Sequence, residues 1–442
     1  MDKHTKIHAR HDDVPKEHRV HRTGDWLPGD HRIHKEWLSG VIEHVDKNPK
    51  DLHPVLQEFK TLIETDTRVY MLMQSMFEQV PTKPPYSSDP TGHRQIRDYE
   101  HMLQLFNHLI TTPPQWSDRS HRVGMVGVPI NAVLDWPMGT PSGFALFLDP
   151  GVNRMLKKVL DAWGEYLRSG ESAKQALNDG PNGWFSADGT ADLTTVANGA
   201  VGTSHTFEDI FECDPSRPYH GFASWDAFFT RKFRENVRPV AAPNDDNVIA
   251  NACESKAYNV ARNVALRDAF WIKGQPYSVL DMLAYDERAP LFAGGTVYQA
   301  GRVVRAYVKE GTYYSEPLFE GVGDPAKRDT DGDAINMQNE NASQVYLTAV
   351  ATRAIIFIKA DNPAIGLMAF LGVGMTEVST CEITVREGDH VKKGDEIGMF
   401  HFGGSTHCLM FRKGVDVQGF PDPGGAENVP VRGKLAVVKS GV

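Results

Sequence analysis

The sequence predicts an α+β protein, in which an N-terminal helical domain precedes a β-rich domain. Two observations predict this class. Apolar residues recur at helical spacing up to about residue 176. After about residue 233, short runs of β-branched and aromatic residues alternate with glycine, asparagine and charged turn residues, which is typical of strands. The chain has 442 residues and exceeds a typical domain of about 100–200 residues, so we expect more than one domain.

Composition excludes several classes of protein. The formal net charge of −10 and the lack of a basic patch argue against a nucleic-acid partner. The longest apolar run, residues 364–375, is shorter than the roughly 18–20 residues that span a bilayer, and the N-terminus lacks the apolar core of a signal peptide. The four cysteines form no CxxC pair and fit neither a disulfide framework nor a thiolate zinc site. We therefore expect a cytoplasmic protein without stable membrane insertion.

The N-terminal half divides into an arm and a helical domain. Residues 1–36 are polar and rich in histidine without a fixed ligand spacing, and we expect a flexible arm. Residues 37–177 carry apolar stripes at helical spacing, between which the proline-punctuated stretch 111–141 is expected to be an ordered loop. The two clearest stripes are Leu52, Val55, Leu56, Phe59, Leu62 and Ile63, and Val152, Met155, Leu156, Val159, Leu160, Trp163, Tyr166 and Leu167.

The chain changes character after residue 177. Residues 178–219 begin with two clusters of Asn, Asp and Gly and are expected to be a linker. A short helix is expected within 224–233. Strands are expected at 303–308 and 354–358, and a buried strand with a turn at 364–375.

The β-rich part contains a weak internal sequence repeat. Val308–Gly311 recurs as Val385–Gly388, and the second copy continues to a further glycine, Gly394. Glycine at these corners lets the chain reverse where a positive φ is needed. The pattern looks like the hammerhead half of biotinyl- and lipoyl-type domains, without the lysine that carries their cofactor. We therefore expect a duplicated hammerhead-like sandwich or barrel.

An acidic loop is a further candidate for metal binding beside the histidine-rich arm. Asp329, Asp331 and Asp333 surround a glycine, but an EF-hand places its glycine one position after the third acidic ligand and adds a distal glutamate. The pattern favours a solvated loop over a specific metal site, and we assign no metal ligands. The sequence leaves open whether the protein binds calcium as a cofactor.

The stretch Gly403-Gly404-Ser405 carries the most distinctive chemistry. Two glycines leave the Gly404 carbonyl sterically open, and the Ser405 hydroxyl could attack it and convert the amide into an ester. The alternative is a glycine-rich turn with an incidental serine. Spacing alone favours that alternative.

Longer motifs favour the attack of Ser405 on the Gly404 carbonyl over an incidental serine. Residues 391–406, VKKGDEIGMFHFGGST, resemble the processing site of the phosphatidylserine decarboxylase family, whose members carry a G-S-[TS] motif there. Further segments resemble the same family in the same order. With the processing site they cover most of residues 220–442, which we expect to be the catalytic domain. They are Phe228–Arg231 with Arg238-Pro239, Phe270–Gly274 with Tyr277–Val279, and Gly372–Glu377 with Thr380-Cys381.

The N-terminal half narrows the resemblance to one branch. Residues 131–167 are similar to the helical extension of a fungal branch that includes the psilocybin-pathway tryptophan decarboxylases. The resemblance implies decarboxylation of a free aromatic amino acid, with L-tryptophan to tryptamine expected first. The alternatives are a phosphatidylserine decarboxylase producing phosphatidylethanolamine and an unprocessed, non-catalytic homologue. The sequence leaves open whether the protein forms a homo-oligomer.

The resemblance also implies how the cofactor arises. Members of this family cut themselves at the bond corresponding to Gly404–Ser405, which here would give chains 1–404 and 405–442. Ser405, between Gly403 and Thr406, would become a pyruvoyl group. Its carbonyl is the electron sink that pyridoxal phosphate supplies elsewhere, so no pyridoxal phosphate is expected.

The sequence departs from the family twice at its acid–histidine pair. Glu254 stands where the family has an aspartate, and it can still orient an imidazole. The family's Y-H-R-[WF]-H segment is missing between Ala300 and Gly301. A shortened gene model, a real loss, or replacement by His401 or His407 would each explain this. We favour the shortened gene model, because the other motifs are intact.

Overall fold

The computed structural model describes residues 31–80, 96–116, 128–255, 257, 259–267, 278–298, 303–314, 348–374, 376–402, 406–422 and 428–439. The chain forms two compact units. The first comprises the described residues of Met1–Asp192, Pro215–Phe229 and Thr312–Gln344. The second comprises those of Leu193–Asp214, Thr230–Gly311 and Val345–Val442.

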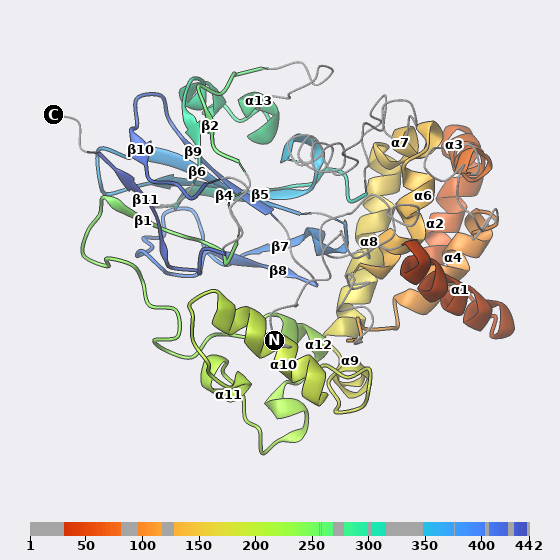
Figure 1. Cartoon of the computed structure of the whole chain (residues 1–442). Coiled ribbons are helices and arrows are strands. Elements are labelled where there is room, and N and C mark those ends of the chain that lie inside the picture. Colours follow the sequence, from red (N-terminus) through yellow and green to blue (C-terminus); the bar gives the residue numbers. More distant parts are fainter. Residues whose placement is uncertain are drawn as a thin grey trace, which may run out of the picture. The chain divides into compact units, whose positions relative to one another are not determined.

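The first unit is helical (Figure 1). Its N-terminal helices, α2, α3, α4, α6, α7 and α8, pack around one apolar interior. The helix α10 crosses the division between the units at Asp192/Leu193. The helices are α1 (His31–Lys47), α2 (Pro54–Thr65), α3 (Thr67–Gln79), α4 (Tyr99–Leu109), α6 (Pro129–Met138), α7 (Pro141–Phe147), α8 (Pro150–Leu167), α9 (Gly170–Ala176), α10 (Ala187–Gly199), the 3-10 turn η7 (Pro218–Gly221) and α12 (Trp225–Phe229).

The two predicted apolar stripes are confirmed as helices. In α2 the buried residues are Leu56, Phe59 and Ile63, which share one face at helical spacing. The helix α8 begins with Pro150, whose missing N–H would have had no helical partner. The Asp149 side chain caps it by accepting hydrogen bonds from two backbone amides of its first turn. Sequence pattern and capping therefore agree on both helices.

The prediction of an ordered loop over residues 111–141 was wrong in part, because Pro129–Met138 form α6. Only the first of its two prolines stands where a helix tolerates one. Pro129 occupies the first turn, and Pro137 comes at the last turn, next to the C-terminal residue. The helix α1 also begins within the expected arm, at His31, and His34 is buried with a ring nitrogen 2.7 Å from the Ala132 carbonyl oxygen.

The second unit is built from antiparallel sheets, and the predicted strands are confirmed. Six strands form one sheet in the order β2-β3-β9-β6-β5-β4, three form another in the order β1-β11-β10, and β7 pairs with β8. Short helical segments are α11 (Phe207–Ile210), α13 (Val279–Met282), η8 (Ala289–Phe292) and η9 (Thr376–Ser379). The strands are β1 (Val248–Ala250), β2 (Ala261–Arg262), β3 (Thr296–Val297), β4 (Val303–Lys309), β5 (Arg353–Lys359), β6 (Leu367–Val373), β7 (Thr380–Ile383), β8 (Gly398–His401), β9 (Thr406–Phe411), β10 (Val417–Gln418) and β11 (Lys434–Val438).

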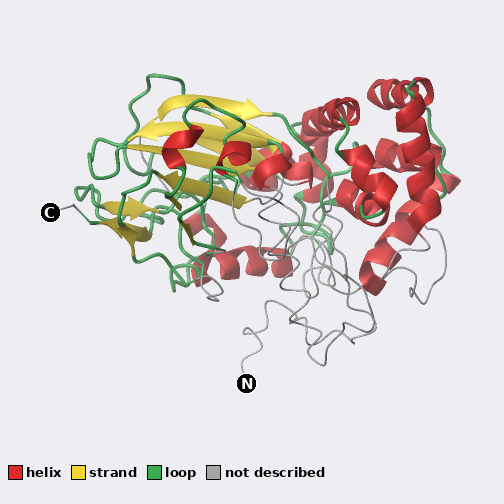
Figure 2. Cartoon of the chain, turned by 90° about the horizontal axis from the view of Figure 1, so that it is seen from above, coloured by secondary structure: helices red, strands yellow, loops and turns green. Residues whose placement is uncertain are grey.

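Apolar side chains cover both faces of the six-stranded sheet, whose strands are yellow in Figure 2. On one face, Leu371 and Met410 belong to a buried cluster with α13 and η8. On the other face, Phe411 belongs to a cluster with Val417 and Leu435 of the three-stranded sheet. Successive residues of a strand point to opposite faces, so β6 and β9 contribute to both clusters. These two strands are therefore central to the unit.

The hairpin between β7 and β8 turns at two glycines, as predicted. Gly388 has a φ of 94° and Gly394 a φ of 90°, a region that other L-residues rarely adopt. The surroundings of the two differ. A Cβ on Gly388 would meet no atom within 4 Å, whereas one on Gly394 would lie 2.5 Å from Cγ2 of Val240.

This difference predicts unequal costs of substitution. Gly388→Ala should destabilise the protein by about 1–2 kcal/mol from backbone strain alone. Gly394→Ala adds a steric clash and should lower the melting temperature further. Adding Val240→Ala to Gly394→Ala should recover part of that extra loss. Melting curves of the variants measure the difference, and equal losses for both glycines would contradict the assigned contact.

Candidate active site

The predicted scissile bond is flanked by strands on both sides. Residues 403–405 lie outside the described residues, which resume at Thr406. Thr406 begins β9 and pairs with Val373 of β6. His401 ends β8 and pairs with Thr380 of β7. The chain before and after the bond is thus held by backbone hydrogen bonds.

Two connections in the chain link the same two strand pairs, β6 with β9 and β7 with β8. The chain passes from β6 to β7 through residues 374–379, and from β8 to β9 through residues 402–405. Since β6 pairs with β9 and β7 pairs with β8, both connections start and end at the same strand pairs. Residues 374–379 therefore link the same two strand pairs as the segment that contains the predicted cut.

Both connections carry backbone strain. Phe402, directly before the paired glycines, has a φ of 76° and is 1% exposed. Thr376, in the neighbouring connection, has a φ of 54° and is also buried, and Glu377 beside it is wholly buried. A non-glycine residue held in this region costs on the order of 1–3 kcal/mol, and such residues cluster at functional sites.

His401 is buried and bound to a carboxylate. Its Nε2 lies 2.8 Å from Oε2 of Glu382, one strand away on β7. The two are diagonal neighbours, because His401 pairs with Thr380 and Glu382 pairs with Met399. A carboxylate on one ring nitrogen fixes the orientation of an imidazole. His401 was a predicted site residue, whereas Glu382 was missed because its partner depends on the register of β7 and β8.

His407 lies among aromatic rings. It stacks on Phe370 at 6.1 Å between ring centroids and meets the edge of Tyr298 at 6.4 Å. Tyr298 in turn packs against Phe420 at 4.5 Å. Burial lowers the pKa of His407 to about 4, so this imidazole is neutral at neutral pH. Burial also raises the pKa of Tyr298 to about 12.

The neighbouring thiols are neutral as well. Burial raises the pKa values of Cys381 and Cys408 to about 12. Cys381 Sγ lies 3.7 Å from the carbonyl oxygen of Gly372, to which it donates a weak hydrogen bond. A thiol needs its thiolate form to act as a nucleophile, so neither cysteine is suited to attack at neutral pH.

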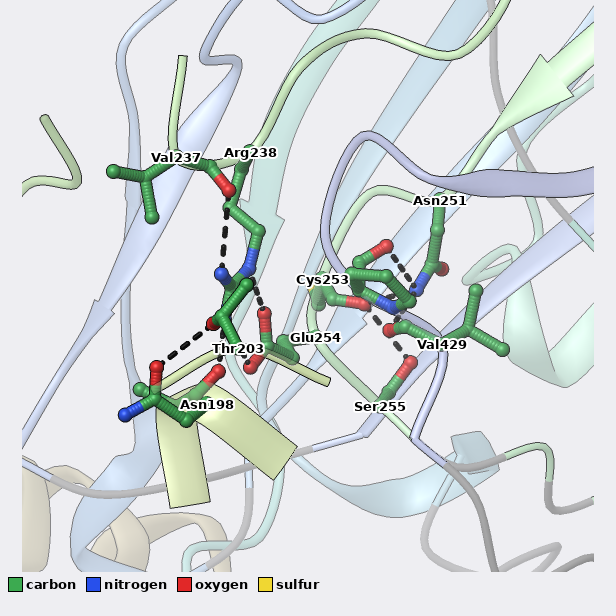
Figure 3. Close-up of polar contacts among 11 residues, drawn as sticks. Asn198, Thr203, Val237, Arg238, Asn251, Cys253, Glu254, Ser255 and Val429 are labelled. Carbon is green, nitrogen blue, oxygen red and sulfur yellow. Dashed lines mark hydrogen bonds and ion pairs between the residues drawn. The ribbon is translucent and has the colours of Figure 1, made fainter. Parts of the chain in front are cut away.

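Glu254 forms an ion pair with Arg238 (Figure 3). The two carboxylate oxygens of Glu254 accept hydrogen bonds from Nε and Nη2 of Arg238 at 2.6 and 3.0 Å. Nη2 also donates to the Ala197 carbonyl, and the guanidinium lies 4.5 Å from the centroid of the Phe233 ring. The carboxylate is thus engaged by a buried arginine. Its predicted role in orienting a histidine stays a prediction.

Two of the strands that follow the predicted cut are held between other strands, while β10 lies at the edge of its sheet. β9 lies between β3 and β6, and β11 lies between β1 and β10. Asn251 Nδ2 donates to the Val429 carbonyl at 2.8 Å, and the backbones of Ser255 and Val429 bond to each other in both directions (Figure 3). Residues after the predicted cut therefore take inner positions in two sheets.

Two further predictions concern metals and membranes. Among the described residues, no group of three or more His, Cys, Asp or Glu side chains could hold a metal ion. The acidic loop at 329–333 and the junction at 300/301 lie outside those residues. Within the described part of the chain, no helix has both the length and the hydropathy to cross a membrane.

Comparison with known proteins identifies close relatives. The chain is 39% identical over 329 residues to decarboxylase iboD of Amanita muscaria, which covers 70% of this chain and 91% of that protein. It is 34% identical over 394 residues to L-tryptophan decarboxylase of Psilocybe cubensis. That alignment covers 84% of this chain and 83% of that protein. It is 35% identical over 380 residues to the L-tryptophan decarboxylase of Psilocybe cyanescens. That alignment covers 81% of this chain and 80% of that protein.

Family models match both halves of the chain. Two models, each described as phosphatidylserine decarboxylase, match residues 53–193 and 225–424. The first covers helices of the first unit, and the second spans the strands on both sides of Gly404–Ser405. The chain belongs to the phosphatidylserine decarboxylase family, in the same branch as the fungal decarboxylases, and is therefore a carboxy-lyase.

Proposed function

We propose that this protein cuts itself between Gly404 and Ser405 and then decarboxylates a free aromatic amino acid, converting L-tryptophan into tryptamine. One observation carries the choice of substrate. Two relatives that align with at least 81% of this chain, at 34% and 35% identity, are named L-tryptophan decarboxylase. The alignments include the helical first unit as well as the sheets.

The surroundings of β9 support this substrate class. Tyr298 and Phe370 pack against His407, which follows Ser405 by two residues, and Phe420 packs against Tyr298. Aromatic rings prefer to pack against other rings, edge-on or offset, and so suit an indole side chain. The neutral state of His407 adds no charge to these apolar surroundings.

The residues around the bond fit a pyruvoyl group. It would form from Ser405 at the start of chain 405–442, with Gly403 on the other side of the cut, and its carbonyl would accept the electrons released with CO2. The backbone pairing of Thr406 with Val373 would hold the group in place. His401 and His407 flank Ser405 in the sequence and are the candidates for replacing the family's missing histidine in self-cleavage. Glu254, whose carboxylate is bound by Arg238, keeps its predicted role of orienting an imidazole.

Several finer features belong to the same proposal. We infer a duplicated hammerhead-like arrangement from the echo of Val308–Gly311 in Val385–Gly388. Three further points stay predictions. They are the domain limits 37–177 and 220–442, the cytoplasmic location and the formation of a homo-oligomer.

The first test is Ser405→Ala. Without the hydroxyl, neither the ester nor the pyruvoyl group can form, so this variant should stay a single chain and release no CO2 from L-tryptophan. Thr384→Ala, which removes an exposed hydroxyl in the β7–β8 hairpin, is the matched control and should cleave normally. Intact mass should show chain 405–442 lighter by one ammonia than the unmodified peptide. A Ser405→Ala protein that still decarboxylates would overturn the proposal.

The second test separates two substrates. The family models carry the description phosphatidylserine decarboxylase, which favours that lipid as the alternative. Purified protein should form tryptamine from L-tryptophan and no phosphatidylethanolamine from phosphatidylserine vesicles. Phe420→Ala should raise KM for L-tryptophan roughly 2- to 12-fold, the equivalent of one aromatic contact. The opposite substrate preference would assign the alternative function.

A third test concerns His407. Its pKa is about 4 in the folded protein against 6.5 for an unperturbed histidine, so between these values the unfolded chain binds a proton that the folded chain does not. Stability should therefore fall as the pH drops through this window. In an uncleaved Ser405→Ala background, adding His407→Gln should remove this part of the loss. Melting temperatures measured against pH check it, and a constant difference between the two proteins would contradict it.

A further inference from the structure

We propose that the contact between α1 and α4 is a pH-sensitive switch that opens when the protein is acidified. Both helices belong to the first unit, so the inference does not depend on the proposed cut or substrate. α1 packs against α4 and α6, and its Leu38 and Val45 are buried (Figure 1). Histidine changes its charge between about pH 5 and pH 8, and histidines lie at two points of this contact.

The first point is His101 of α4, whose imidazole fits its surroundings only when neutral. Its side chain is 3% exposed, and its Nδ1 accepts a hydrogen bond from the backbone N–H of Arg97 at 3.2 Å. In a neutral ring, an accepting Nδ1 leaves the proton on Nε2. When the ring takes a second proton, Nδ1 becomes a donor. Protonation therefore removes this hydrogen bond and leaves two donors facing each other.

Arg97 connects this imidazole to α1. Its Nη1 and Nη2 donate to the two carboxylate oxygens of Asp46 on α1, at 2.8 and 2.7 Å. Such a bidentate ion pair depends on the direction of the guanidinium. Nε2 of His101 lies 3.7 Å from Oδ1 of the same Asp46. A shift of the backbone at Arg97 therefore weakens the ion pair that joins the two helices.

The second point is a pair of imidazoles from the two helices. The rings of His44 on α1 and His108 on α4 lie 4.6 Å apart between centroids, tilted by 41°. Two positively charged rings at this distance repel each other. Lys50, which follows α1, adds a further positive charge that acts on His108. Protonation of the pair therefore pushes α1 away from α4.

The surroundings favour the neutral form of both α4 histidines. Burial lowers the pKa of His101, and the charge of Arg97 lowers it further, while Asp46 and Asp98 act in the opposite direction. Burial also lowers the pKa of His108, with contributions from the charges of His44 and Lys50. The closed contact thus resists protonation at both points.

Further charges on the neighbouring elements form ion pairs with one another. On α1, Lys47 pairs with Glu43. Between α2 and α4, Lys60 pairs with Glu100, and it also pairs with Glu64 of its own helix. The ionisable side chain of α6 is Asp135.

His34 is not part of the switch. Its Nε2 lies 2.7 Å from the carbonyl oxygen of Ala132 on α6, and a protonated ring can still donate a hydrogen bond there. This contact does not require a neutral imidazole, in contrast to that of His101 with Arg97.

The direction of the pH effect follows from the lowered pKa values. Release of α1 returns His101 and His108 to water, where the pKa of a histidine is about 6.5. Below that pH the released form binds protons that the closed form does not, so the closed form loses stability as the pH falls. The contact is therefore closed above about pH 7 and opens progressively below about pH 6.5.

The experiment measures amide hydrogen exchange of the full chain by mass spectrometry at about pH 7.5 and about pH 5.5, corrected for the intrinsic pH dependence of exchange. Peptides from α1 should lose protection at the lower pH, by up to about tenfold for each of the two α4 histidines, because a group with a pKa of about 6.5 is about 90% protonated there. Peptides from α8, a helix of the same unit without histidine, should keep their protection.

Two substitutions test the assigned residues. The double variant His101→Gln with His108→Gln should show the same protection of α1 at both pH values. A packing defect caused by glutamine would lower protection equally at both, so the ratio between them reports the protons alone. His205→Gln, at an exposed histidine of the second unit, is the control and should keep the wild-type response.

Two results would overturn the switch. One is wild-type protein whose α1 keeps its protection at the lower pH. The other is a double variant that responds to pH as the wild type does. Should the double variant fail to fold, His108→Gln alone carries the test, because this histidine is only partly buried. It should remove up to about tenfold of the loss, and an unchanged response would overturn the proposal.

Discussion

The pairing of β9 with β6 is the constraint on which the rest of the site depends. It places Thr406, the residue after the predicted cut, beside Val373, while the β7–β8 ladder places His401 before the cut. Each end of the cleavage segment is thereby held by backbone hydrogen bonds rather than by side chains. The strain at Phe402 can persist because the sheets on either side over-determine the chain path.

Charge is distributed unevenly around this segment. The thiols of Cys381 and Cys408 and the imidazole of His407 are all kept neutral by burial. Glu382, which reaches water, is the carboxylate bound to His401. The imidazole of His407 and the two thiols therefore add no charge beside β9 at neutral pH.

The sequence predicted those features that depend on local pattern. The stripes of α2 and α8, the strands β4 to β6 and the turn at Gly388 follow from spacing and residue type. The helix α6 was missed because proline was taken as a breaker, although its position within a helix decides its effect.

Contacts between distant segments were not predictable in the same way. The Glu382–His401 pair needs the register of a hairpin, and the Glu254–Arg238 ion pair needs the path of a loop. A single sequence names the residue types but does not fix which carboxylate meets which base. That is why Glu254 was selected from the resemblance while Glu382 was overlooked.

The order of the strands along the chain has a consequence for maturation. β9 and β11 complete their sheets only by joining partners made much earlier, since Val248 of β1 pairs with Val437 of β11. A partly synthesised chain lacks these strands and cannot assemble the surroundings of the bond. The proposed self-cleavage would then mark a chain whose second unit has finished folding, and misfolded copies would stay uncut.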